Sequence, residues 1–203
     1  MEQTEDWAIV ILATSGLRDF VESALVGIRD CGINLARVHI VLPSKASAEL
    51  RETITKFGGT ARILEEIIGE VGDLPNEYVE YGTPEFTRLM KLRFRIIRSI
   101  INEVPRLVSA DVDVAWLRNP LPYLAKVLDQ YPLAFQTEAD PYFPQNFCAG
   151  FFALRDHDFT RGLIDNHIAR FDSAPPEVTM QVLLNDIIRE SRVSLKRIFP
   201  LPE

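Results

Sequence analysis

The sequence predicts an α/β fold in which a mostly parallel sheet is flanked by helices. The continuous apolar run at residues 8–13 and the second run at 38–42, which is apolar except for His39, have the length of buried strands. Each is followed by a stretch that is expected to form a helix. A third strand at 61–64 completes a strand–helix–strand–helix–strand alternation, which implies parallel strands joined by right-handed crossovers. The chain of 203 residues is long enough for one domain, spanning 1–203, with a sizeable core.

The first two helices are expected between these strands. One covers residues 17–30, after the turn Thr14-Ser15-Gly16. Its apolar face is made of Phe20, Val21, Leu25 and Ile28. The other begins after Ser47, whose hydroxyl suits an N-cap, and ends at about Phe57. Residues 65–82 are interrupted by Gly and Pro and predict a loop with one short helix.

The clearest helical pattern begins at Thr83, a suitable N-cap that precedes Pro84. Its apolar stripe is Phe86, Leu89, Met90, Ile97, Ile100, Ile101 and Val104. Arg93 falls within this stripe. Its charged end therefore either snorkels from the edge of the core or serves a functional site.

The apolar run that begins at Leu107 predicts another buried strand, and it ends in two carboxylates, Asp111 and Asp113. In extended backbone, residues two apart point to the same side, so both acids would face one spot. Such close carboxylates repel unless a proton, a basic side chain or a divalent cation lies between them. Oxygen ligands suit Mg²⁺ or Mn²⁺, which often bridge to phosphates. The alternative is a solvated strand exit without a function.

The carboxyl ends of the strands are the expected place for a ligand, because ligands of open parallel sheets bind there. A helix that leads into a parallel strand runs antiparallel to it, so its first half lies near that end. We therefore expect Arg88, Lys91 and Arg93 to approach the two acids. Arg98 should lie away from them. A cation at this point could hold a phosphate or balance the acids.

The second half of the chain continues the same alternation. Its elements are expected as helix 123–130, strand 133–135, polar loop 136–146, strand 148–154, helix 161–171, helix 178–191 and strand 193–199. Ala149-Gly150 within the strand indicates either close approach of a ligand or a β-bulge. Gln181 and Asn185 are four residues apart and share one helix face, as site residues or as surface amides.

Composition excludes several classes of protein. The net charge of −7 argues against a nucleic-acid surface, and two cysteines with three histidines argue against a disulfide framework or a thiolate or histidine metal site. No apolar run is long enough for a membrane span. As written the chain is expected to be cytoplasmic, or to act in the Golgi lumen if it is excised from a membrane-anchored precursor.

Taken together, the motifs resemble the nucleotide-diphospho-sugar transferase family, which has the GT-A glycosyltransferase fold and includes plant cell-wall xylosyl- and arabinosyltransferases. The similar blocks are Tyr81 to Phe86 with Leu89-Met90 and Arg93, the Asp-x-Asp segment Asp111 to Pro120, Cys148 to Phe152, and Met180 to Asn185. Their order and spacing cover nearly the whole chain from Trp7 onward. None of the blocks is specific alone, but jointly they are.

The resemblance implies a retaining hexosyl- or pentosyltransferase that uses a nucleotide-diphosphate sugar, such as a UDP-sugar, with Mn²⁺ or Mg²⁺ and a carbohydrate or other hydroxyl acceptor. It implies that Asp113 ligates the metal and that Asp111 reaches the metal or the ribose. Gln181 would lie by the anomeric carbon, with front-face attack and double displacement both open. The remaining implied nucleotide and donor contacts are Thr14, Ser15, Arg93, Val112, Ala149, Gly150 and Asn185.

Two departures from the family pattern leave alternatives open. Met180 stands where the family has Asp before Gln, and no His follows His167, although the family usually supplies a late His ligand. The chain is therefore either C-terminally truncated, completed by water or donor at the metal, or a degenerate module that only binds a nucleotide sugar. A haloacid-dehalogenase-like phosphatase, which also places Asp-x-Asp after a strand, is a further alternative.

Overall fold

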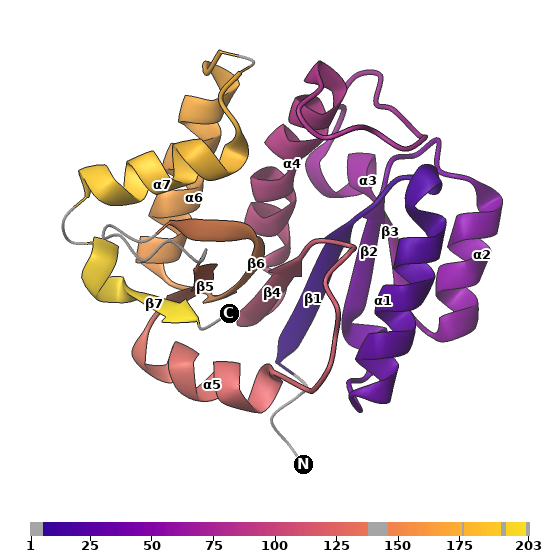
Figure 1. Ribbon diagram of the computed structural model, residues 1–203, viewed down its shortest axis with the longest axis horizontal. Helices are drawn as coiled ribbons and strands as arrows, with labels where there is room; N and C mark the ends of the chain where they lie inside the picture. The colour runs from indigo at the N-terminus through magenta and orange to yellow at the C-terminus, as the bar shows by residue number, and fades with distance from the viewer. Residues whose placement is uncertain (1–5, 138–145, 176, 192–193, 202–203) are drawn as a thin grey trace.

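The computed structural model describes residues 6–137, 146–175, 177–191 and 194–201, and Figure 1 shows their arrangement. Seven strands form one sheet in the order β3-β2-β1-β4-β6-β5-β7. They are β1 Trp7–Leu12, β2 Val38–Leu42, β3 Thr60–Ile63, β4 Arg106–Ala110, β5 Leu133–Thr137, β6 Phe147–Arg155 and β7 Ile198–Leu201. Strand β6 is antiparallel to both β4 and β5, whereas the other pairs are parallel. The predicted mostly parallel sheet is confirmed.

Helices cover both faces of the sheet. They are α1 Arg18–Asp30, α2 Ala48–Phe57, α3 Leu64–Ile68, α4 Pro84–Ile100, α5 Leu121–Gln130, α6 Asp158–Asp172 and α7 Met180–Glu190. Three short 3₁₀ helices lie at Ser15–Leu17, Leu35–Arg37 and Ser194–Arg197. One face packs against α1, α2 and α5, and the other packs against α3, α4, α6 and α7. Figure 1 shows α1 and α2 side by side on the first of these faces.

The central strand β1 is apolar throughout because both faces of the sheet are buried there, whereas the edge strand β3 is only partly buried and contains Thr60 and Arg62. In β1, Ile9 and Ile11 face the α1–α2–α5 core, whereas Ala8 and Val10 face the opposite core. This alternation follows from the two-residue period of a strand.

Local signals fix most helix ends. The hydroxyls of Ser47 and Thr83 accept hydrogen bonds from the backbone N–H groups of Leu50 and Phe86, as N-caps do. Gly58 ends α2 with a φ of 89°, which a residue without a Cβ adopts at little cost. The helix boundaries predicted from these residues are therefore confirmed to within a residue.

Some expectations differ from the structure. Phe20 is 49% exposed and not part of the core, because it lies about 90° around the helix from the centre of the buried stripe formed by Val21, Ala24, Leu25 and Ile28. The last strand is shorter than expected, since Ser194–Arg197 is a 3₁₀ helix and only Ile198–Leu201 pairs with β5. Of the predicted polar loop, residues 138–145 lie outside the described residues, and Gln136 and Thr137 belong to β5.

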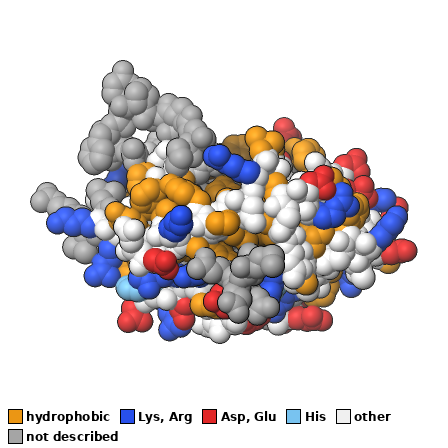
Figure 2. Space-filling model, turned by 90° about the horizontal axis from the view of Figure 1, so that it is seen from below, with side chains coloured by type: hydrophobic (Ala, Val, Ile, Leu, Met, Phe, Trp, Pro, Cys, Tyr) orange, Lys and Arg blue, Asp and Glu red, His pale blue; other side chains and the backbone are white. Residues whose placement is uncertain are grey.

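In the described ranges, no helix combines the length with the apolar character that crossing a bilayer requires. On the face seen in Figure 2, the visible acidic and basic side chains are interspersed, with hydrophobic side chains between them.

Candidate functional site

The acidic motif Asp111 to Asp113 and the turn that begins at Thr14 follow the carboxyl ends of two neighbouring strands. Asp111 follows the last residue of β4, and Thr14 comes two residues after the end of β1, which is the parallel neighbour of β4. The backbone of Asp111 does not continue as a strand, because Val114 N–H donates to Asp111 O at 3.3 Å and closes a turn. The expected extended alternation between Asp111 and Asp113 is therefore wrong, although both acids stand at the predicted edge.

A buried cation holds the Asp111 carboxylate. Arg93 Nη1 donates to Asp111 Oδ1 at 2.5 Å, and Arg93 is only 5% exposed. Arg93 Nε and Nη2 donate to Ser109 Oγ at 3.1 and 3.0 Å. The interpretation that Arg93 merely snorkels toward water is wrong, because its charged end is bonded inside the protein. The helix-direction argument for Arg93 is confirmed.

Gly150 lies against the Asp111 oxygen that does not bond Arg93. Asp111 N–H donates to Gly150 O at 2.7 Å, and a Cβ on Gly150 would lie 2.8 Å from Asp111 Oδ2. The same segment is irregular, because Phe135 pairs with Phe152 while Gln136 pairs with Cys148. Ala149-Gly150 is thus both a bulge relative to β5 and a place of close approach to a polar group.

The electrostatics of Asp111 reflect these neighbours. Burial raises the pKa of the Asp111 carboxyl above its ordinary value, the charge of Arg93 opposes that rise, and the charge of Asp113 adds to it. Asp113 itself is exposed. The site therefore pairs a half-exposed acid that is bonded to a buried cation with a second acid that is open to solvent.

A pocket with a volume of about 150 Å³ opens beside Asp111. Five of the residues predicted for the site line it, namely Arg93, Asp111, Ala149, Gly150 and Gln181. Its apolar wall consists of Tyr81, Phe86, Met90, Phe171 and Met180. Thr87, Glu177 and Thr179 add polar groups. The pocket is thus charged at one end and largely apolar beyond it.

The two amides of α7 hold β6 in different ways. Gln181 Oε1 accepts a hydrogen bond from Ala149 N–H at 3.0 Å and faces the pocket. Asn185 is buried, where it accepts from Phe147 N–H at 2.8 Å and donates to Phe147 O at 2.9 Å. Neither is a simple surface amide, and Asn185 does not line the pocket.

Thr14 and Ser15 lie outside this pocket and contact a loop. The Thr14 hydroxyl donates to Glu77 O at 2.9 Å, and the Ser15 hydroxyl donates to Asn76 Oδ1 at 2.7 Å. A Cβ on the next residue, Gly16, would lie 2.0 Å from Tyr78 N, so only glycine fits beneath this loop. Residues 76–78 therefore pack against the turn that follows β1.

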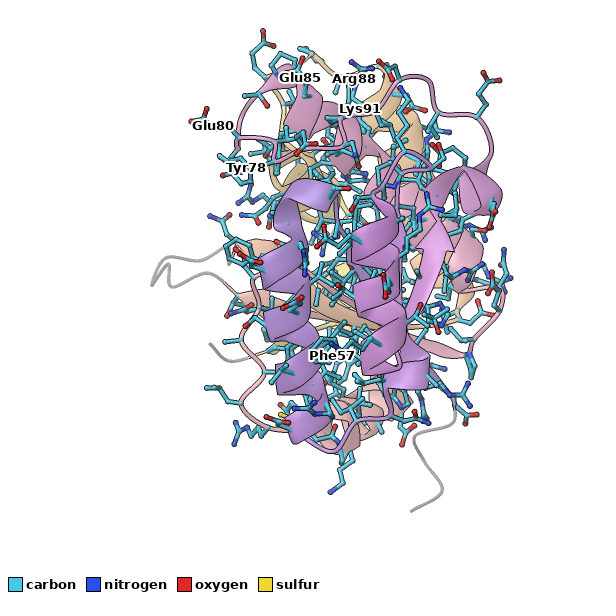
Figure 3. The ribbon with its side chains drawn as sticks, turned by 90° about the vertical axis from the view of Figure 1, so that its right-hand side faces the viewer. Phe57, Tyr78, Glu80, Glu85, Arg88 and Lys91 are labelled. Carbon is cyan, nitrogen blue, oxygen red and sulfur yellow. The ribbon has the colours of Figure 1, made fainter. Side chains whose placement is uncertain are left out.

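Val112 and Asp113 also lie outside the pocket lining, on the turn that follows β4. The expectation for Arg88 and Lys91 is wrong. Both line a separate groove of about 320 Å³, and Lys91 Nζ stands 5.3 Å from the centre of the Phe171 ring. Figure 3 shows Arg88 and Lys91 near Glu85, at the start of α4. Arg98 pairs with Asp165 at 2.8 Å, away from the acids as predicted.

Two buried polar residues near the site were not predicted. Ser109 had a signal, because it is a polar residue in an apolar strand and stands two positions before Asp111. His167 Nε2 lies 3.1 Å from Met180 O, at the start of α7, and burial lowers the pKa of His167 to about 4. Its sequence position gave no comparable signal.

The divalent metal that the resemblance implies needs oxygen ligands, which the acidic motif can supply. In the part of the chain that the structure describes, no three His, Cys, Asp or Glu side chains gather as a potential metal site. Asp111 and Asp113 are nevertheless hard oxygen ligands whose charges act on each other. They fit a divalent ion whose remaining ligands come from a diphosphate and water.

The family model for nucleotide-diphospho-sugar transferases matches residues 65–197. This range contains Arg93, both acids of the Asp-x-Asp motif, Gly150 and Gln181. No curated protein sequence matches the chain.

Solved structures match the fold over nearly the whole chain. Galactosyltransferase LgtC, in complex with donor and acceptor sugar analogues, is 14% identical, with 95% of this chain and 72% of that chain covered and a TM-score of 0.64. Mouse xyloside xylosyltransferase 1 is 12% identical, with 96% and 84% covered and a TM-score of 0.60. Glucosyl-3-phosphoglycerate synthase from Mycobacterium tuberculosis, with Mn²⁺, UDP and phosphoglyceric acid, is 15% identical, with 97% and 68% covered and a TM-score of 0.56. At these identities the matches show the GT-A fold.

Proposed function

The chain belongs to the nucleotide-diphospho-sugar transferase family, and from this premise we propose that it transfers a sugar from a UDP-sugar to a hydroxyl acceptor, with retention and with Mn²⁺ or Mg²⁺. The observation that carries the proposal is the fixed carboxylate of Asp111 at the charged end of the pocket. Arg93 bonds it on one side and Gly150 leaves room for it on the other. A carboxylate held in this way is prepared to receive a cation and the diphosphate bound to it.

Asp113 and Asp111 would hold the divalent ion. When bound, the ion neutralises the charge that develops on the leaving diphosphate. Asp113 is exposed and would bind it directly. Asp111 Oδ1 accepts the hydrogen bond from Arg93, so the other oxygen, Oδ2, would bind the ion or the ribose.

The nucleoside and the sugar of the donor would bind at two different parts of the site. We place the nucleoside at the carboxyl end of β1, near Thr14, Ser15 and Val112, beside the loop 76–78. The transferred sugar and the acceptor would occupy the pocket, whose apolar wall suits the C–H faces of sugar rings. Gln181 lines this pocket, where its side-chain oxygen accepts a hydrogen bond from Ala149 N–H. Its amide would face the anomeric carbon.

Asn185 would act on the donor indirectly. Its amide bonds both backbone groups of Phe147 and also donates to Gln181 O at 2.9 Å. The two bonds to Phe147 tie α7 to β6, which carries Ala149 and Gly150. The bond to Gln181 O lies within α7. Asn185 therefore supports the donor-facing residues.

The proposal is tested by a thermal-shift comparison of UDP, GDP and ADP, each with Mn²⁺ and with EDTA. UDP with Mn²⁺ should raise the melting temperature most, because a ligand at about 100 times its Kd adds roughly 2.7 kcal/mol. UDP with EDTA should give a much smaller shift, since carboxylates and diphosphate repel. Equal shifts with Mn²⁺ and with EDTA would contradict the proposed metal-bridged donor site.

A second function is favoured by one specific observation. Met180 lines the pocket next to Gln181 with a side chain that offers a sugar hydroxyl only a weak sulfur acceptor. A module that binds UDP without transferring sugar would show the same thermal shift. Mn²⁺-dependent hydrolysis of UDP-glucose, UDP-galactose and UDP-xylose separates the two, because only the transferase should release UDP. Family membership leaves the phosphatase alternative without support.

A further inference from the structure

Ser109 bonds the side of Arg93 that is turned away from Asp111. Its hydroxyl accepts from Nε at 3.1 Å and from Nη2 at 3.0 Å, while Nη1 donates to Asp111. Ser109 is 1% exposed and is the next-to-last residue of β4. A guanidinium is planar, with its N–H groups in a fixed fork. Holding Nε and Nη2 in place therefore also fixes the direction in which Nη1 points.

We propose that Ser109 is a positioning residue of the site, which sets the orientation of the Asp111 carboxylate through the Arg93 fork. The inference rests on the proposed function, because the carboxylate is positioned for a metal-bound nucleotide diphosphate. Without the hydroxyl, the contacts of the guanidinium within the described residues are its bond to Asp111 and its contact with Phe152, whose ring centre lies 5.6 Å from Cζ. Neither contact prevents the guanidinium from rotating about the line that joins Nη1 to Asp111 Oδ1.

The orientation of the Asp111 carboxylate matters because Gly150 lies against the oxygen that does not bond Arg93. The backbone of Gly150 accepts from Asp111 N–H, and the space at its Cβ position is 2.8 Å from Oδ2. The carboxylate therefore lies in a narrow gap between the Arg93 fork and β6. A rotation of the fork would move Oδ1 and, with it, the oxygen left for the donor.

The test compares Ser109→Ala with Ser109→Thr, which keeps the hydroxyl. Ser99→Ala is the matched control, because the Ser99 hydroxyl also donates a hydrogen bond, to Ile67 O at 3.2 Å, which is partly buried. Ser99 lies on α4, six residues after Arg93. Calorimetric titration measures UDP affinity with Mn²⁺, and melting is recorded for each variant. Loss of a group that orients a metal ligand typically weakens metal affinity about 10–100-fold. We expect a loss of that size for Ser109→Ala, with Ser99→Ala unchanged and Ser109→Thr restored to near wild type.

A direct readout of the fork accompanies the titration. In the ¹⁵N NMR spectrum, the Nε–H of Arg93 should exchange slowly with water in the wild type and in Ser109→Thr, and rapidly in Ser109→Ala. If Ser109→Ala lowers the melting temperature but binds UDP with Mn²⁺ as tightly as wild type, Ser109 is only structural and the inference is overturned. An equal loss in Ser109→Ala and Ser99→Ala overturns it as well. If the wild type does not bind UDP with Mn²⁺, the proposed function itself fails, which is a different result.

Discussion

Arg93 Nη1 and Asp111 Oδ1 lie 2.5 Å apart, and this bond ties the acidic motif to the middle of α4. The guanidinium side chain is 6% exposed, whereas the carboxylate side chain is 46% exposed. The cation is therefore the buried partner, and it depends on the acid for its charge compensation. Asp111 thus has a structural role in addition to its proposed role at the metal.

The first prediction is that Asp111→Asn destabilises the fold. Asparagine keeps the shape but not the charge, so a buried cation loses its counter-charge. Removing one partner of a fully buried pair costs about 3–5 kcal/mol. Because this carboxylate is half-exposed, we expect the free energy of unfolding to fall by about 1.5–3 kcal/mol, the range of a hydrogen bond to a charged group. Urea unfolding of the metal-free protein measures it.

The control for this prediction is the pair Arg93→Met and Arg93→Met/Asp111→Asn. Once the cation is gone, the Asp111 substitution should cost about 1 kcal/mol or less, and the resulting coupling energy isolates the pair. Additive effects of the two substitutions would show that the cation does not depend on Asp111.

The second prediction is that Asp113→Asn removes metal-dependent UDP binding without loss of stability. Asp113 is exposed, and its charge raises the pKa of Asp111, so removing it relieves repulsion in the metal-free protein. Melting should be unchanged or slightly higher. UDP affinity with Mn²⁺ should fall about 100-fold or more, since a metal ion supplies several kcal/mol of charge stabilisation.

Asp129→Asn is the matched control, because Asp129 pairs with Arg106 at the start of β4, the end of the strand opposite to the site. It should leave UDP affinity unchanged. If Asp113→Asn and the wild type bind UDP with Mn²⁺ equally well, Asp113 is not a ligand of the metal.

The sequence predicted the mostly parallel sheet, both ends of α2 and the start of α4 because their signals are local. Buried strands are continuous apolar runs, and Ser47 and Thr83 cap their helices with their own hydroxyls. It also predicted that Arg93 meets the acidic motif, because the direction of α4 follows from the parallel sheet.

The same argument failed for Arg88 and Lys91 because it locates residues along a helix axis but not around it. At 100° per residue, Arg88 lies about 140° and Lys91 about 160° around the helix from Arg93. They therefore face the separate groove. The packing of residues 76–78 against Gly16 was equally beyond a sequence argument, because it depends on the path of a loop held by contacts distant in the chain.

The third prediction is that Gly150→Ala damages the site. The new Cβ would lie 2.8 Å from Asp111 Oδ2, closer than real Cβ atoms come to other atoms, so the carboxylate or β6 must shift. UDP affinity with Mn²⁺ should fall about tenfold or more, and the free energy of unfolding should fall by about 1–3 kcal/mol, the usual cost of overpacking. Titration and urea unfolding measure the two effects.

Gly162→Ala is the control, because a Cβ there meets nothing within 4 Å in the middle of α6. It should leave UDP binding unchanged and stabilise the fold by up to about 1 kcal/mol, through the higher helix propensity of alanine. If Gly150→Ala behaves like Gly162→Ala, the gap beside Asp111 is wider than the structure indicates.

The last prediction concerns His167 and acid stability. Burial lowers the pKa of His167 from 6.5 to about 4, so the folded state keeps the imidazole neutral while the unfolded state binds a proton. The free energy of unfolding should therefore fall as the pH drops from about 6.5 to 4, by up to about 3 kcal/mol at 1.36 kcal/mol per pKa unit. Urea unfolding at pH 7, 6, 5 and 4.5 measures this loss.

His167→Gln is the comparison that assigns the effect. Glutamine does not titrate, and its amide can donate to Met180 O as the imidazole Nε2–H does in the wild type. A neutral ring that donates through Nε2 leaves Nδ1 as the atom that would take up the proton. Within the described residues Nδ1 has no hydrogen-bond partner, so a proton there would be buried without an acceptor, which disfavours the charged ring in the folded state. The variant should lose much less stability between pH 6.5 and 5 than the wild type. If both lose stability equally over that window, groups other than His167 take up the proton.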